Sequence, residues 1–286
     1  MTSTLPVDFQ LGPAALRVSD AESALDFYVN KIGLELRQRG DTTAMLGTRE
    51  SDLLRLDIVP GIAPRNYKET GLYHVAILLP DRPSLGAAIA RLAAHKVKLG
   101  AADHLVSEAI YVWDPDNNGI EIYRDRPRHE WTWQNDQVQM ANRPLDFEGL
   151  LAEPDVGMLA TNAMKNGTRI GHVHLEVDDL VKAKKFYGEI VGFTPTSTFP
   201  GAQFLGAGGY HHHLAANIWE SRNGPPPSPS TAGLSQMTFE LPDDASMLAL
   251  KARLEAAATK TIPNDNGFDF TDPWLTLISV RRKLER

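Results

Sequence analysis

Apolar and polar residues alternate strictly along several short stretches of the chain. In 171–180, "GHVHLEVDDL", Val173, Leu175 and Val177 alternate with polar residues that include His172. Because successive side chains of a strand point to opposite faces, this pattern predicts a strand with one apolar and one polar face. The stretch 73–80, "YHVAILLP", places His74 on the polar face in the same way. The apolar faces should pack under helices, and the polar faces should line a cavity.

A helix and further short strands are predicted after each alternating strand. In the first part of the chain an Asp-containing turn is followed by Leu25, Tyr28 and Ile32, whose spacing of three and four residues is typical of a helix with one apolar side. A Gly-containing turn and short apolar runs such as "AMLGT" and "LLRLDIV" then predict further strands. The predicted unit is a strand, a helix and three strands.

The chain repeats this unit. "LRVSDAESALDFYVNKIGLEL" from Leu16 and "LEVDDLVKAKKFYGEIVGFTP" from Leu175 share one template without a slip in register. "LPDRPSLGAAIARLAAHKV" from Leu79 and "LPDDASMLALKARLEAAAT" from Leu241 form a second matching pair. Such self-similarity indicates an α+β protein built from four βαβββ units.

The four units divide the chain into two similar halves. We expect units one and two in residues 1–124 and units three and four in residues 169–286. The connecting segment 125–168 should wrap the surface.

Composition narrows the classes of function. The formal net charge is -7 and the basic residues are not bunched, which argues against nucleic acid or an anionic membrane as a partner. Cysteine is absent, so a metal would have to be held by His, Asp or Glu. No stretch approaches the length of an apolar membrane span, and the first residues carry no charged leader. We therefore expect a cytoplasmic location.

Aligning the units singles out three residues. The first strands can be aligned on the turns that follow them, and six positions before each turn the units carry Pro13, His74, His172 and Gln236. In the last strand of unit two, Glu121 lies seven residues after Asp114. The same step from Asp272 in unit four reaches Ser279. Units two and three thus offer two histidines and a glutamate, whereas units one and four offer no ligand set.

His74, His172 and Glu121 are therefore the predicted metal ligands. Two imidazoles and one carboxylate form an open facial triad, which suits Fe(II) or Mn(II), and Zn(II) accepts the same ligands. One metal site is expected, and the other pair of units should be structural. His174 and Glu176 share the polar face with His172 but are left outside the metal shell.

This pattern resembles the vicinal oxygen chelate superfamily, and within it the extradiol ring-cleavage dioxygenases of the catechol 2,3-dioxygenase type. The resemblance covers residues 11–282 and depends on "LYHVAILLP", "DHLVSEAIYVWDPDNNGIEIYRDRP", "IGHVHLEV" and "GGYHHHLAANIWES". It implies four βαβββ modules paired into two half-barrels, with His172, His74 and Glu121 as metal ligands. In better-known members the metal lies in the last two modules, so a site between modules two and three requires a different pairing.

The resemblance also implies roles for further residues. Tyr111, ten positions before Glu121, and His104 of "HLVS" would hydrogen-bond to substrate or oxygen. A histidine of the triplet 211–213 would act as acid and base. Strand alternation places His211 and His213 on one face and His212 on the other, and we favour His213 with His211 beside it.

The reaction implied by the resemblance is ring opening of a catechol by O2 to a semialdehyde, with Fe(II) as cofactor. Two alternatives stay open: a glyoxalase-like isomerase or lyase with another metal and a fourth protein ligand, and a non-enzymatic binding protein for small aromatic molecules. Exposed sheet edges would also favour a homodimer.

Overall fold

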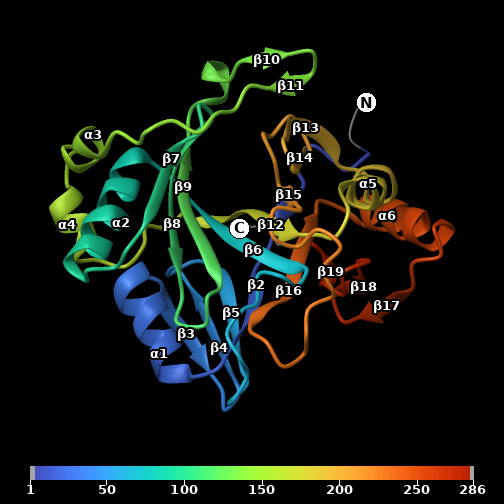
Figure 1. The fold of residues 1–286 in the computed structure, drawn as a ribbon, viewed down its shortest axis with the longest axis horizontal. Coiled ribbons are helices and arrows are strands. Elements are labelled where there is room, and N and C mark those ends of the chain that lie inside the picture. Colours follow the sequence, from blue (N-terminus) through green and yellow to red (C-terminus); the bar gives the residue numbers. More distant parts are fainter. Residues whose placement is uncertain (1–3, 284–286) are drawn as a thin grey trace.

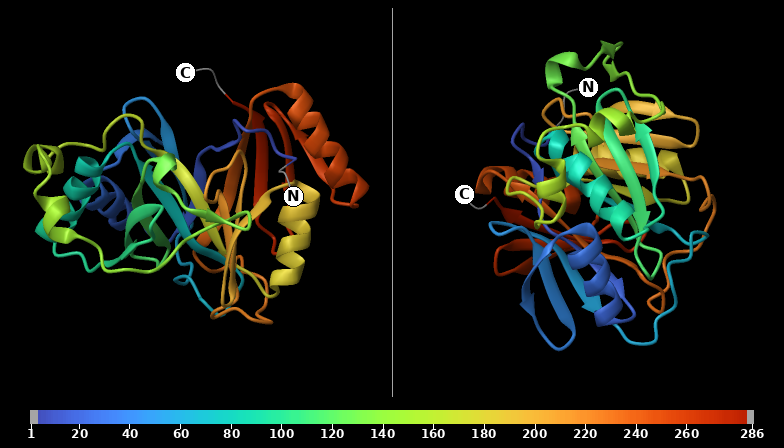
Figure 2. Two further views of the ribbon diagram at one scale, coloured as in Figure 1. Left: turned by 90° about the horizontal axis from the view of Figure 1, so that it is seen from above. Right: turned by 90° about the vertical axis from the view of Figure 1, so that its left-hand side faces the viewer.

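The computed structural model describes residues 4–283, so the outermost residues of the two predicted halves, 1–3 and 284–286, lie outside it. Two large curved sheets form the body of the protein (Figure 1). The helices of modules one and two lie on one side of the molecule and those of modules three and four on the other, as the view from above also shows (Figure 2). The predicted α+β fold of four βαβββ modules, paired into two half-barrels, is confirmed.

Each module contains a first strand, a helix and three further strands. Module one comprises β2 (Ala14–Val18), α1 (Ala21–Leu25) with its π-helical continuation η1 (Asp26–Ile32), β3 (Glu35–Arg39), β4 (Thr43–Gly47) and β5 (Asp52–Ile58). Module two comprises β6 (Gly71–Leu79), α2 (Arg82–Ala94), β7 (Gly100–Asp103), β8 (Ser107–Trp113) and β9 (Gly119–Asp125). Module three comprises β12 (Arg169–Glu176), α5 (Leu180–Ala183) with η3 (Lys184–Val191), β13 (Thr194–Phe199), β14 (Ala202–Gly206) and β15 (Leu214–Asn217). Module four comprises β16 (Gly233–Leu241), α6 (Asp244–Ala256), β17 (Thr261–Asn264), β18 (Gly267–Thr271) and β19 (Leu277–Arg282).

The helix ends follow from local sequence. An aspartate side chain accepts a hydrogen bond from a backbone N–H of the first turn in every module; these caps are Asp20, Asp81, Asp179 and Asp243. Each such cap typically stabilises a helix by about 1 kcal/mol. The helices of modules one and three end at Gly33 and Gly192, whose φ angles of 96° and 104° favour glycine over any residue with a Cβ atom.

The modules pair across the two halves of the sequence. Modules two and three share a sheet of order β13-β14-β15-β12-β6-β9-β8-β7, and modules one and four share β17-β18-β19-β16-β2-β5-β4-β3. At the centre of the first sheet β12 and β6 are antiparallel, with His172 opposite Ala76 and His174 opposite His74. The strand β9 runs parallel to β6 and places Glu121 beside Ala76. Three adjoining strands thereby bring distant polar residues together.

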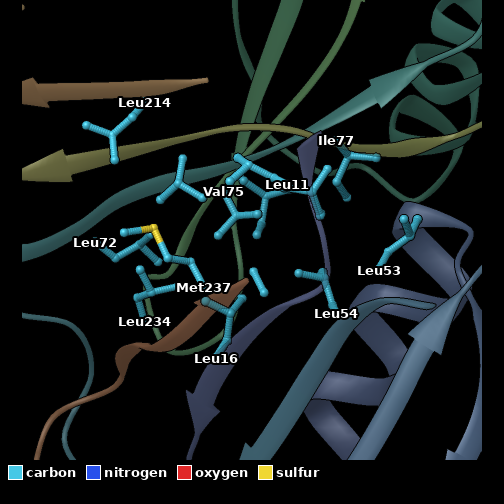
Figure 3. Close-up of a cluster of buried hydrophobic side chains, with 14 of the residues drawn as sticks. Leu11, Leu16, Leu53, Leu54, Leu72, Val75, Ile77, Leu214, Leu234 and Met237 are labelled. Atoms are coloured by element: carbon cyan, nitrogen blue, oxygen red, sulfur yellow. The ribbon is translucent and has the colours of Figure 1, made fainter. Parts of the chain in front are cut away.

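A continuous apolar core joins the two sheets. Figure 3 shows part of this core, in which Val75 and Ile77 of β6 belong to the same cluster as Leu16 of β2 and Met237 of β16. All four side chains are buried. Complete burial of one such side chain contributes about 1.5–3 kcal/mol. Because alternate residues of β6 are committed to this core, His74 must point to the opposite face.

A tyrosine and an aspartate link consecutive modules in both halves. Tyr28 of η1 donates a hydrogen bond of 2.9 Å to Asp114, in the turn between β8 and β9. Tyr187 of η3 donates the equivalent bond to Asp272, between β18 and β19. Both pairs are buried, so each module helix is tied to the next module although the two modules belong to different sheets.

The segment 125–168 runs over the outside of module two. It carries η2 (Arg128–Glu130), the hairpin β10 (Trp133–Gln134) and β11 (Gln137–Val138), and the helices α3 (Phe147–Leu151) and α4 (Val156–Ala160). The two helices pack on α2, and the hairpin projects at the top of Figure 1. A further short strand, β1 (Gln10–Leu11), pairs with β16. Within residues 4–283, every helix is too short or too polar to cross a membrane.

Candidate metal centre

Three side chains converge on the polar face of the sheet shared by modules two and three. His74 lies on β6, His172 on β12 and Glu121 on β9, and all three are buried. The Nε2 atoms of His74 and His172 lie 3.0 Å and 3.1 Å from Glu121 Oε2 and 3.3 Å from each other. Within residues 4–283 this is the single group of three or more such donors that could hold a metal ion.

The spacing of the donors fits a divalent cation. Ligand atoms about 2.1 Å from a metal are separated by about 3.0 Å when they subtend a right angle and by about 3.4 Å at the tetrahedral angle. The three separations fall within that range. The other ring nitrogen of His172, Nδ1, is buried and has no hydrogen-bond partner among the described residues. The polar contacts of this ring are therefore all on the side of the donor group.

The protonation states of two of the donors, Glu121 and His74, also suit a cation. Burial by itself would raise the pKa of Glu121, but the charge of His172 and hydrogen bonds from both histidines outweigh burial and hold this pKa well below its usual value. Burial lowers the pKa of His74, against the opposing effect of Glu121. The carboxylate is thus ionised and the His74 imidazole neutral near neutral pH, as metal ligation requires.

The donors lie in a cavity of about 390 Å³. Its walls are mainly apolar, with Met140, Phe199 and Phe204 among the lining residues. Trp113 and Trp219 also line it and remain about half exposed, which places them toward solvent. A cavity of this size, with apolar walls and a few convergent polar groups, is typical of a site for a small organic molecule.

His104 and Tyr111 line the same cavity and are hydrogen-bonded to each other. His104 Nδ1 lies 3.0 Å from the carbonyl oxygen of Ala141, so this nitrogen donates. The Nε2 atom therefore accepts, and the Tyr111 hydroxyl donates to it at 2.6 Å. Burial, with Glu121 nearby, raises the pKa of Tyr111 well above its usual value, so Tyr111 is a neutral phenol.

The histidine triplet 211–213 is divided between two environments. His212 lines the cavity, and its ring centroid is 4.1 Å from that of His172. His213 lines a different cavity of about 200 Å³, where its Nδ1 accepts the backbone N–H of Ala207 at 3.2 Å. His211 lies behind His212 and does not line the cavity of the metal donors. The structure therefore places neither His213 nor His211, the two residues favoured from the sequence, beside that cavity.

The family of the chain is consistent with this geometry. The profile of the glyoxalase/bleomycin resistance protein/dioxygenase superfamily matches residues 10–122 and 169–277, which include all three donors. The chain belongs to this superfamily. Membership in the vicinal oxygen chelate superfamily, expected from the sequence, is confirmed.

Several relatives match nearly the full length of the chain. A catechol-2,3-dioxygenase of Bacillus subtilis (strain 168) is 41% identical over 274 residues, which are 93% of this chain and 94% of that protein. A solved structure of a putative dioxygenase from Bacillus subtilis subsp. subtilis str. 168 has a TM-score of 0.65 at 12% identity and covers 100% of this chain and 87% of that chain. Glyoxalase I from Zea mays has a TM-score of 0.57 at 17% identity and covers 96% of this chain and 92% of that chain. The chain is thus a homologue of a catechol dioxygenase, and the two structures show the shared fold.

The sequence placed the triplet 211–213 on a strand and therefore did not single out His212 as the member that lines the cavity. In this superfamily member β15 begins at Leu214, and the triplet lies in a loop that follows left-handed turns at Gly208 and Gly209. Strict alternation does not apply there. The "GAGGY" stretch before the triplet was the available signal, since paired glycines predict a turn.

The two other polar residues on the His172 face of β12, His174 and Glu176, have partners outside the donor group. His174 Nε2 lies 3.1 Å from the side-chain amide of Asn217. Glu176 is completely buried and pairs with Arg65, whose side chain is almost as buried. Arg65 also donates to the carbonyl oxygen of Leu72 at 2.8 Å and thereby fixes the chain entering β6. Nothing in the sequence alignment of the units indicated this arginine.

Proposed function

We propose that the protein is an Fe(II)-dependent extradiol dioxygenase that opens the ring of a catechol with O2 to a semialdehyde. The observation that carries this proposal is the open-sided group of His74, His172 and Glu121 within a mainly apolar cavity. The 41% identity to a catechol-2,3-dioxygenase over most of the chain supports the same reaction. Mn(II) and Zn(II) suit the same donors, and metal analysis separates the three ions.

The three donors would hold the metal and leave neighbouring coordination positions open. Fe(II) bound there would supply a centre that chelates both catechol oxygens and passes electron density to O2. The apolar walls, including Phe199 and Phe204, would contact the ring faces and exclude water. Overall, both atoms of O2 enter the product, and the carbon–carbon bond beside the two hydroxylated carbons breaks. No further reductant is consumed.

Two groups of this chain would manage protons and charge. Of the triplet 211–213, His212 is the member that lines the cavity of the metal donors, and we assign to it the acid–base role that the resemblance implied for this triplet. It would accept a proton from a catechol hydroxyl and return one as the ring opens. Tyr111 and His104 line another side of the cavity, where the Tyr111 hydroxyl would turn from His104 and donate to substrate or oxygen as negative charge develops.

The decisive experiment combines metal analysis of anaerobically purified protein with oxygen uptake over a panel of catechols. The proposal predicts one iron per chain and oxygen uptake matched by a yellow, ring-opened product. Iron-replete protein that consumes no oxygen with any catechol would contradict it.

The glyoxalase-like alternative expects a fourth protein ligand and needs no oxygen. The donor group within residues 4–283 has three members, which favours the dioxygenase. Activity that persists without oxygen would favour the isomerase or lyase instead. Recovery of intact ligand after aerobic incubation with the iron-loaded protein would indicate a binding protein.

A further inference from the structure

A line of hydrogen bonds leads from the cavity into the protein behind His212. His212 Nδ1 lies 2.8 Å from Nδ1 of His211. On the far side of that ring, His211 Nε2 lies 2.8 Å from Asp125 Oδ1. Asp125 ends β9, the strand that carries Glu121, and its side chain is 21% exposed. The line therefore connects the wall of the cavity to a carboxylate near the surface.

The bonding partners determine where the hydrogens lie when both histidines are neutral. A carboxylate only accepts hydrogen bonds, so His211 must carry its hydrogen on Nε2 and donate it to Asp125. His211 Nδ1 is then an acceptor, and His212 must donate to it from Nδ1. The remaining nitrogen of His212, Nε2, consequently has a free lone pair. Among residues 4–283 the hydrogen bond of the His212 side chain is made through Nδ1 and not through Nε2, although the ring lines the cavity.

We propose that Asp125 and His211 are positioning residues that hold His212 in the tautomer with hydrogen on Nδ1, so that Nε2 offers a lone pair to the cavity. The role in the reaction rests on the proposed function: Nε2 takes the proton of a catechol hydroxyl, and the electron pair of the broken O–H bond stays on the catechol oxygen. The tautomer itself is a property of the protein whatever its substrate.

The surroundings of His211 keep this ring in one orientation. Its centroid lies 4.2 Å from the ring of Tyr210 and 5.1 Å from that of Trp131, and the side chain is buried. Its backbone carbonyl accepts the hydroxyl of Thr196. The His211 ring is therefore shielded from water, whereas Asp125 is partly exposed. Two rival arrangements each carry one more proton. A doubly protonated His211 would donate from Nδ1 and leave the hydrogen of His212 on Nε2, and a doubly protonated His212 would carry hydrogen on both nitrogens.

Nitrogen NMR distinguishes these arrangements without reference to activity. The experiment uses protein labelled with ¹⁵N-histidine and loaded with diamagnetic Zn(II), with the His212 signals assigned by their loss in His212→Gln. The proposal predicts a protonated Nδ1 and an unprotonated Nε2 on His212. A hydrogen on Nε2 of His212 in the wild-type protein would overturn it.

The variant Asp125→Asn tests the cause of the tautomer. An asparagine offers both a donor and an acceptor, so His212 should become a mixture of tautomers. The control is Asp57→Asn on β5, the equivalent strand of the other sheet, because Asp57 is also 21% exposed and lies in an ion pair. It should leave the His212 signals unchanged. Unchanged His212 signals in Asp125→Asn would refute the role of Asp125.

Kinetics then test the consequence for the reaction. Asp125→Asn should lower kcat by about 100-fold, in the range of general acid–base contributions, and leave KM nearly unchanged. Asp57→Asn should leave both constants unchanged. If wild-type protein shows the expected tautomer but no oxygen uptake, the proposed function fails and the positioning does not. If it consumes oxygen and His212 carries hydrogen on Nε2, the positioning proposal fails and the proposed function does not.

Discussion

The two sheets have the same strand order but different residues at their centres. In the sheet of modules two and three, the position beside Ala76 holds Glu121. In the sheet of modules one and four, the corresponding position beside Ala15 holds Arg55. Arg55 pairs with Asp57 at 2.8 Å and lies 3.5 Å from the side-chain oxygen of Gln236.

This difference explains why one of the two similar sheets presents a candidate metal site and the other does not. A guanidinium is permanently charged and would repel a cation, whereas two neutral imidazoles and a carboxylate attract one. Pro13 and Ser279 occupy the positions equivalent to His74 and Glu121, and neither offers an imidazole or a carboxylate. The fold supplies the convergence of strands in both sheets, and a few side chains decide which sheet can bind metal.

The largest expected effect comes from removing the carboxylate of the donor group. Glu121→Gln keeps the shape but loses the charge, so metal affinity should fall by more than the roughly 10–100-fold that loss of an outer partner costs. Oxygen uptake should disappear with the metal. Metal content per chain measures the first effect. The matched control is Ser279→Ala in module four, which should retain wild-type metal content; equal loss in both variants would remove the distinction between the sheets.

Adjacent histidines provide the next test. His212→Gln should lower kcat by about 10²- to 10⁴-fold, because it removes the group assigned to proton transfer. His213→Gln should retain most activity, since His213 lines a separate cavity. Steady-state oxygen uptake separates the two. An inactive His213→Gln variant that still binds metal and folds would return the role to His213.

The two halves share a buried tyrosine–aspartate pair, and both pairs should respond to pH in the same way. Burial raises the pKa values of Asp114 and Asp272 to about 6. Since these pKa values are raised, the stabilisation from each group is complete below about pH 4 and is lost as the pH rises through 6, by about 3 kcal/mol at most. In Asp114→Asn and Asp272→Asn, the free energy of unfolding should fall less between about pH 4 and about pH 7 than it does in the wild-type protein. Urea unfolding at the two pH values measures this, and unchanged pH dependence in both variants would contradict the buried-acid account.

The smallest effect is expected from the Tyr111 hydroxyl. Tyr111→Phe loses one hydrogen bond to His104 and should lower kcat/KM by about tenfold, without loss of metal. Wild-type kinetics in this variant would mean that the hydroxyl does not contact substrate or oxygen.

The sequence predicted the modules well because their signals are local. Alternating residues such as Val75 and Ile77 identify strands, and the aspartate caps identify helix starts. Aligning the modules also selected the three donors that the structure brings together. Their role as ligands remains a prediction until metal is measured.

The sequence did not predict contacts that depend on pairing between distant segments. The alternation of apolar and polar residues does not single out Arg55 or Arg65. Their partners Gln236 and Glu176 lie on other strands. Asp125 approaches His211 only because β9 and the loop before β15 lie close together in the fold. The position of His212 in the cavity wall was not predicted because a loop, unlike a strand, has no fixed alternation of side chains.

Anomalous diffraction from crystals of anaerobically iron-loaded protein tests the central claim most directly. The account predicts one iron peak per chain, about 2.0–2.2 Å from Nε2 of His74, Nε2 of His172 and a carboxylate oxygen of Glu121. A peak elsewhere, or iron-loaded crystals with no peak among these three side chains, would contradict it.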